Sequence, residues 1–199
     1  MASLTATEIA RGKLDQLRPE ALSLLTRLMA DFETATALKT TVPDYGGYRT
    51  AATQQQLLDW RDQAGETYAV GGVTSSRHVY GGAFDLRVLT NQGGAWKSID
   101  AWSGGKVRPE YVKLGELGEK LGLTWGGRWS GASSDPYHFQ LNETLAQAQS
   151  RFTDFAGRRL QGGAAVVPVV AGPVASGASS TWGWLLVLGI ALAIVTAED

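Results

Sequence analysis

Apolar positions at helical spacing predict helices in several parts of the chain. Between Pro19 and Ala37 they fall three or four residues apart, which predicts a helix with one face in the core. Further helices are predicted from about Thr53 to Gln63, with Thr53 as N-cap, from Pro109 to Gly122, and within 143–160. The apolar positions of the first helix are Leu22, Leu25, Leu28, Met29 and Phe32.

Alternating positions predict strands between these helices. Residues 83–90 alternate in character, which indicates a strand, and a short strand is predicted to end at Arg49. Strand-like runs also occur near Trp125 and His138. Two Gly-Gly pairs lead us to expect a loop over 89–107. Because helices and strands do not alternate regularly, the pattern predicts an α+β fold.

Composition narrows the class of protein. The chain has 199 residues, 44% of them hydrophobic, which is enough for one core with some chain left over. It has 18 Lys+Arg and 19 Asp+Glu, a net charge of -1, and no dense basic run, so nucleic acid is not an expected partner. The absence of cysteine excludes disulfides and cysteine-ligated zinc.

The chain changes character after Leu160. We expect a globular domain over 1–160 and a linker rich in Gly, Ala, Pro and Val over 161–180. The apolar segment 181–197 would be about 25 Å long as a helix, at the short end for a membrane span. A single transmembrane helix is predicted there in preference to a buried apolar helix, because the linker separates it from the domain. The N-terminal segment has no apolar core, so no secretory signal is expected.

The two histidines of the chain both lie near aspartates. His78 precedes Asp85 by seven residues, with Gly81-Gly82 between them, and His138 lies on a later strand-like run. Imidazole and carboxylate are zinc ligands, and three such ligands with one open position describe a hydrolytic zinc centre. Other divalent ions also bind such sites. Spacing alone leaves a metal site and its alternatives, a packed histidine, a plain turn or a hairpin, about equally weighted.

Two further charged residues suit catalysis at such a centre. Asp135 lies three residues before His138, where its carboxylate could act as the base for a metal-activated water. Arg49 is a candidate for stabilising a carbonyl oxygen as it becomes anionic, because guanidinium keeps its charge at any relevant pH.

Three motifs resemble those of the M15 zinc peptidases, the D-alanyl-D-alanine carboxypeptidase and phage endolysin group. They are SRHVYGGAFD, TWGGRWSGASSDPYHFQL and GYRTAATQQQLL, in the family's order. The resemblance implies a small antiparallel sheet with flanking helices, as in the hedgehog signalling domain. It also implies that His78, Asp85 and His138 bind Zn²⁺, that Asp135 is the general base, and that Arg49 polarises the scissile carbonyl. Gln54 and Ser76 are weaker candidates for substrate binding, with a helix-surface glutamine and a turn serine as the alternatives.

The resemblance further implies a substrate, and the apolar segment 181–197 suggests a place of action. The expected reaction is hydrolysis of the L-alanyl-D-glutamate bond of peptidoglycan stem peptides by a phage or prophage endolysin. D-alanyl-D-alanine carboxypeptidase activity is the alternative, and a non-catalytic, zinc-containing cell-wall-binding or virion module is another. We expect a monomer held at the bacterial inner membrane by 181–197, made in the cytoplasm and acting in the cell wall or periplasm.

Overall fold

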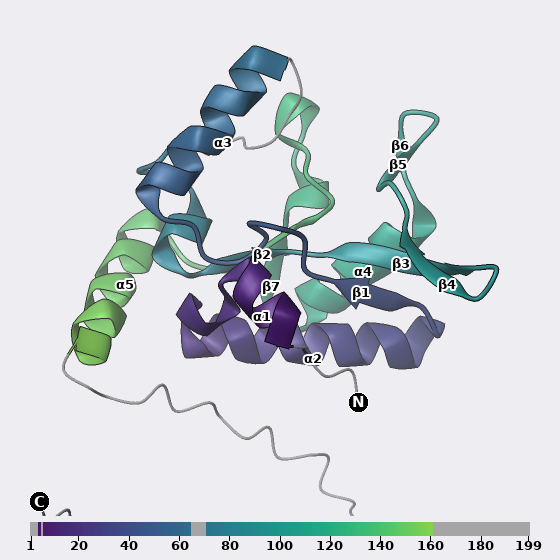
Figure 1. The fold of residues 1–199 in the computed structure, drawn as a ribbon, viewed down its shortest axis with the longest axis horizontal. Helices are drawn as coiled ribbons and strands as arrows, with labels where there is room; N and C mark the ends of the chain where they lie inside the picture. The colour runs from purple at the N-terminus through teal and green to yellow at the C-terminus, as the bar shows by residue number, and fades with distance from the viewer. Residues whose placement is uncertain (1–3, 5, 65–70, 161–199) are drawn as a thin grey trace, which may run out of the picture. The chain divides into compact units, whose positions relative to one another are not determined.

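The computed structural model describes residues 4, 6–64 and 71–160, which form a mixed arrangement of helices and short antiparallel strands (Figure 1). The α+β prediction is confirmed. The helices are α1 (Ala6–Gly12), α2 (Pro19–Thr36), α3 (Ala51–Ala64), α4 (Pro109–Lys120) and α5 (Leu145–Leu160), with short 3₁₀ turns η1 (Leu14–Gln16), η2 (Arg77–Tyr80), η3 (Gly126–Arg128) and η4 (Gly131–Ser133). The strands are β1 (Lys39–Thr41), β2 (Ala83–Asp85), β3 (Arg87–Gln92), β4 (Ala95–Ser98), β5 (Trp102–Ser103), β6 (Lys106–Val107), β7 (Leu123–Trp125) and β8 (His138–Leu141).

The described strands form two three-stranded sheets and one two-stranded ribbon. One sheet has the order β1-β3-β4, the other has the order β2-β8-β7, and β5 pairs with β6. All of these pairings are antiparallel. The strand predicted over 83–90 is therefore two strands, because the chain passes from one sheet to the other at Leu86. There the Leu86 N–H donates to the Tyr137 carbonyl at 2.9 Å instead of to a ladder partner.

The helices begin and end largely where local sequence predicts. Pro19 and Pro109 occupy the first turns of α2 and α4, where a missing N–H costs nothing. The predicted cap of α3 was wrong by one turn, because the Thr50 side chain accepts the Thr53 N–H at 3.0 Å and the helix begins at Ala51. The strand predicted to end at Arg49 is wrong as well, since the strand in this region is β1.

The segment 89–107 is not a loop. It forms the hairpin β3–β4 and the smaller hairpin β5–β6, and Figure 1 shows the latter projecting from the rest of the domain. Both turns carry a Gly-Gly pair with positive φ, 66° and 90° at Gly93 and Gly94 and 57° and 75° at Gly104 and Gly105. Two successive positive φ values match the twist of a two-residue hairpin, which is why the pairs mark turns between strands here.

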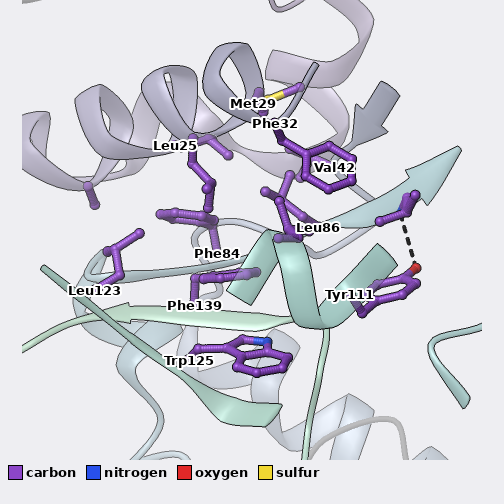
Figure 2. Close-up of a cluster of buried hydrophobic side chains, with 14 of the residues drawn as sticks. Leu25, Met29, Phe32, Val42, Phe84, Leu86, Tyr111, Leu123, Trp125 and Phe139 are labelled. Atoms are coloured by element: carbon purple, nitrogen blue, oxygen red, sulfur yellow. Dashed lines mark hydrogen bonds between the residues drawn. The ribbon is translucent and has the colours of Figure 1, made fainter. Parts of the chain in front are cut away.

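The core lies between α2, α4 and the two sheets. Figure 2 shows Leu25, Met29 and Phe32 of α2 facing Phe84 of β2, Phe139 of β8 and Leu86, which lies between β2 and β3. The rings of Phe84 and Phe139 stack at 5.8 Å between centroids. Phe84 and Phe139 are also directly opposed on the paired strands. Asp85 follows Phe84 and His138 precedes Phe139, so these two residues form the next opposed pair. Packing of this aromatic pair therefore fixes the strand pairing that carries the candidate ligands.

The predicted linker 161–180 and the predicted membrane span 181–197 lie outside the described residues. Within residues 4–160, apart from the undescribed positions, no helix is both long enough and apolar enough to cross a membrane.

Candidate active site

The three predicted metal ligands come together in the structure. Asp85 and His138 are directly opposed on the paired strands β2 and β8. His78 comes from η2, which leads into β2 through Gly81-Gly82. Among the described residues, these three form the one group of His and carboxylate side chains placed to hold a metal ion.

The distances within this group fit a small divalent metal. His78 Nε2 lies 3.1 Å from His138 Nδ1 and 3.3 Å from Asp85 Oδ1, and His138 Nδ1 lies 3.2 Å from the same carboxylate oxygen. A tetrahedral zinc site with bonds of about 2.0–2.2 Å separates its ligand atoms by roughly 3.3–3.6 Å. The three atoms therefore form a nearly equilateral face of about the required size, with donors that suit zinc.

Hydrogen bonds on the far side of each imidazole set the tautomer that a ligand needs. His78 Nδ1 donates to the Gly47 carbonyl at 2.7 Å, which leaves the lone pair of Nε2 directed to the group. His138 has the opposite arrangement, because its Nε2 donates to Gln140 Oε1 at 3.2 Å and its Nδ1 faces Asp85. A ligand histidine in a metal site usually donates its second N–H in this way.

The charges of the group also suit metal binding. Burial, together with the charge of Arg49, lowers the pKa of His78 to about 4, so its imidazole is neutral at neutral pH. Burial alone would raise the pKa of Asp85, but the neighbouring His78 and Arg49 hold it well below its usual range. Arg49 Nη2 donates to Asp85 Oδ2 at 2.6 Å, leaving Oδ1 facing the two histidines. The ionised carboxylate of Asp85 and the neutral imidazole of His78 therefore face the same point as the imidazole of His138.

Asp135 lies beside the group and differs from Asp85 in its protonation behaviour. Burial, followed by the charge of Asp85, raises the pKa of its carboxyl. Its Oδ1 accepts the Tyr137 N–H at 3.1 Å, which fixes the side chain in the turn before β8. A carboxyl with a raised pKa at the wall of a cleft has the properties of a general base.

A close backbone approach positions this turn. The Asp135 N–H donates to the Gly126 carbonyl at 3.0 Å. A Cβ on Gly126 would lie 2.5 Å from the Asp135 carbonyl oxygen, so only glycine fits at that position. The glycine of the Trp-Gly-Gly motif thus lets η3 approach the Asp135 turn closely.

Arg49 and Gln54 form a buried network behind the candidate ligands. Arg49 Nε donates to the Tyr45 carbonyl at 2.7 Å and Nη1 donates to Gln54 Oε1 at 3.3 Å. Gln54 Nε2 in turn donates to the Gly71 carbonyl at 2.5 Å. Gln54 is 1% exposed, which excludes the helix-surface alternative, and Ser76 is buried beside His78 on the wall of the smaller cleft. The contacts of Arg49 show it orienting Asp85, while its role toward a substrate carbonyl stays a prediction.

The Gly81-Gly82 pair connects η2 to β2 through a closely packed part of the fold. Its residues pack against Arg18, whose backbone N–H donates to the Gly81 carbonyl at 3.0 Å. A Cβ on Gly82 would lie 2.7 Å from Arg18 Nη2. Arg18 is buried and forms an ion pair with Glu143. The two glycines therefore leave room for this buried ion pair, which packs against the segment between His78 and Asp85.

Two clefts meet at the group. The smaller, about 290 Å³, is lined by the three candidate ligands together with Ser76, Trp129 and Gln140. The larger, about 760 Å³, is lined by Arg49, Asp85 and Asp135 and extends between aromatic and charged walls formed by Tyr45, Trp60, Arg87, Trp102 and Tyr137. Because Arg49, Asp85 and Asp135 line both clefts, a ligand in either one reaches the carboxylates.

Sequence reasoning missed Gln140 as a partner of the site. It lies two residues after His138 on β8, so both side chains leave the strand on the same face. The His-x-Gln spacing on a predicted strand would have pointed to it. The Gly47 carbonyl and the Trp129 ring, 5.2 Å from the His138 ring, carry no comparable sequence signal.

Replacing Gln140 with alanine should weaken zinc binding by about 10–100-fold, the usual effect of removing a hydrogen-bond partner of a ligand histidine. The reason is that His138 Nε2 loses its acceptor, so the tautomer with a free Nδ1 is no longer favoured. Calorimetric titration with zinc would measure the change. The matched control is Gln56→Ala on the exposed side of α3, and equal affinities of the two variants would contradict the role of Gln140.

Comparison with known families agrees with this geometry. Residues 70–141 match a family model described as D-alanyl-D-alanine carboxypeptidase. The matched segment contains the three candidate ligands and Asp135, while Arg49 and Gln54 precede it. No curated protein matches the chain. The resemblance to the M15 peptidases is thereby confirmed over residues 70–141, the segment that carries the three candidate ligands and Asp135.

Proposed function

We propose that this chain is a zinc-dependent peptidase that hydrolyses the L-alanyl-D-glutamate bond of peptidoglycan stem peptides in the manner of a phage or prophage endolysin. The observation that carries the peptidase proposal is the triangle of His78 Nε2, His138 Nδ1 and Asp85 Oδ1 beside a cleft-lining Asp135 with a raised pKa. The family match supports a peptidase acting on peptidoglycan. The finer assignment of the bond rests on the resemblance in sequence.

Each residue has a distinct part in this proposal. His78, Asp85 and His138 would hold zinc, which when bound supplies the Lewis acidity that polarises a carbonyl and acidifies water. Asp135 accepts a proton from the attacking water and returns it to the leaving amine. Arg49 donates to Asp85 and keeps it ionised and oriented, and because its guanidinium also lines both clefts it is the group assigned to polarise the scissile carbonyl.

Digestion of purified peptidoglycan by the full-length protein tests the proposal. The released fragments would be identified by mass spectrometry, with and without a chelator. New amino termini on D-glutamate are the expected result, and they should disappear when the metal is removed. Activity that a chelator leaves unchanged would contradict the metal-dependent mechanism.

D-alanyl-D-alanine carboxypeptidase activity is the second candidate, because the matching family model carries that description. The same digestion separates the two, since a carboxypeptidase releases D-alanine and creates no new amino terminus. A non-catalytic module is the third candidate. It would bind zinc fully and yield neither product, but it would have no need for Asp135 at the cleft.

We further propose that 181–197 anchors the protein at the bacterial inner membrane until lysis brings the peptidase to the wall. The support is the uninterrupted apolar character of this segment after an uncharged linker. Fractionation of cells that express the full chain or a form ending at Leu160 tests it. The shortened form should leave the membrane pellet, and its retention there would refute the anchor.

A further inference from the structure

The larger cleft is lined by Arg11, Arg49 and Arg87, and two of these have carboxylate partners. Arg11 Nε lies 3.1 Å from Asp44 Oδ1, and Arg49 Nη2 lies 2.6 Å from Asp85 Oδ2. Arg87 differs, because within residues 4–160 as described it takes part in no ion pair and no side-chain hydrogen bond. Arg11 and Arg49 are therefore paired with carboxylates, whereas Arg87 has no carboxylate partner among the described residues.

Arg87 is nevertheless held in place. Its guanidinium carbon lies 5.2 Å from the centroid of the Tyr137 ring, a cation–π arrangement that leaves the N–H groups at its edge free to bind an anion. Tyr137 is a rigid support, since its hydroxyl donates to Asp100 at 2.7 Å and accepts the Ala101 N–H at 2.9 Å. Its ring also packs edge-on against Tyr111 at 5.3 Å.

The position of Arg87 relates it to the reaction. It lies two residues after Asp85, at the start of β3, and its supporting ring lies two residues after Asp135. All four side chains line the same cleft. A substrate extending from the candidate ligands along this cleft therefore passes an exposed, oriented guanidinium that forms no ion pair with any residue of the part of the chain that the structure describes.

We propose that Arg87 binds a free carboxylate of the peptide substrate and is a specificity-determining residue of this cleft. The inference rests on the proposed function for the identity of the peptide. A stem peptide offers two sources of such a group, the carboxyl of D-glutamate that is not part of the peptide chain and the C-terminal carboxyl of D-alanine. Planar, two-pronged recognition of a carboxylate is the interaction for which guanidinium is suited.

Three matched peptides distinguish these sources: an unmodified stem peptide, the same peptide with the D-glutamate carboxyl converted to a carboxamide, and the same peptide amidated at its C-terminus. Each would be assayed with the zinc-loaded full-length protein. Binding would be measured separately by tryptophan fluorescence in an Asp135→Asn background. The variants are Arg87→Gln and Arg87→Lys, with Lys97→Gln as control because it removes an exposed cation of β4 that does not line the cleft.

Wild-type protein should prefer the free carboxylate over one of the two amides by about tenfold in kcat/KM, mostly through KM, the low end for a charge-assisted hydrogen bond. Arg87→Gln should abolish the preference, Arg87→Lys should keep part of it, and Lys97→Gln should keep all of it. The amide that loses binding identifies the carboxylate. Equal handling of all three peptides by the wild type, or an unchanged preference in Arg87→Gln, would overturn the proposal.

The binding measurements separate this proposal from the proposed function. An Arg87-dependent preference in binding without hydrolysis would leave the carboxylate site standing and reject the peptidase. Hydrolysis without any Arg87-dependent preference would support the peptidase and reject the carboxylate site. Absence of both binding and hydrolysis would reject the two together.

Discussion

Replacement of Asp135 with alanine should reduce hydrolysis of stem peptides by about 10²–10⁴-fold, the range that a positioned general acid–base group contributes. Asp135 has a pKa raised by burial and by the charge of Asp85, and it lines both clefts beside the candidate ligands. The loss should appear in kcat, because the side chain accepts its proton only as the reaction proceeds. Steady-state kinetics with a defined stem peptide would measure it.

Zinc binding must be retained for this result to concern catalysis. Asp135 is not one of the three candidate zinc ligands, so Asp135→Ala should bind zinc with nearly wild-type affinity. The matched control is Asp154→Ala, which removes an exposed carboxylate from α5 and should leave kcat unchanged. A variant that binds zinc normally and retains full kcat would show that Asp135 is not the base.

Replacement of His138 with alanine should remove the stabilisation of the protein by zinc. A ligand present at 100 times its Kd stabilises a folded protein by about 2.7 kcal/mol, which corresponds to roughly 5–10 °C in Tm for a domain of this size. Wild-type protein should show this rise when zinc is added, and His138→Ala should not, because one of three donor atoms is gone. Thermal unfolding with and without zinc is the measurement.

The choice of metal provides the control. Magnesium prefers an octahedral shell of oxygen atoms, and two of the three donors here are imidazole nitrogens. Magnesium should therefore leave the Tm of the wild type unchanged. A zinc-induced rise of equal size in wild type and His138→Ala would mean that the metal binds elsewhere.

The candidate ligands could be predicted from sequence because their surroundings are local. His78 and Asp85 lie on either side of a Gly-Gly pair, and Asp135 and His138 share one short turn. Only one long-range contact, the pairing of β2 with β8, is needed to bring these two local groups together. The stacked rings of Phe84 and Phe139 stabilise that pairing. Helices α2 and α4 could be predicted for the same reason, because a proline in the first turn of each marks its start in the sequence.

Features that depend on distant contacts could not be predicted in this way. The division of residues 83–90 between two sheets depends on the Leu86 N–H finding the Tyr137 carbonyl, 51 positions away in the chain. The packing of Gly82 against Arg18 depends on Glu143, from the far end of the domain. An exposed loop and an exposed hairpin have similar amino-acid compositions. The prediction of a loop over residues 89–107 was wrong for this reason.

The two Gly-Gly hairpin turns have a consequence for how such a protein could diversify. A Cβ added at Gly93, Gly94, Gly104 or Gly105 would meet nothing within 4 Å, so both tips are surrounded by open space. Lengthening a surface loop costs little free energy, because the closure penalty grows only with the logarithm of its length. Trp102 on β5 lines the larger cleft, whereas His78, Asp85 and His138 belong to other elements. Insertions at these tips could therefore reshape substrate choice over evolutionary time while the hydrolytic machinery is inherited intact.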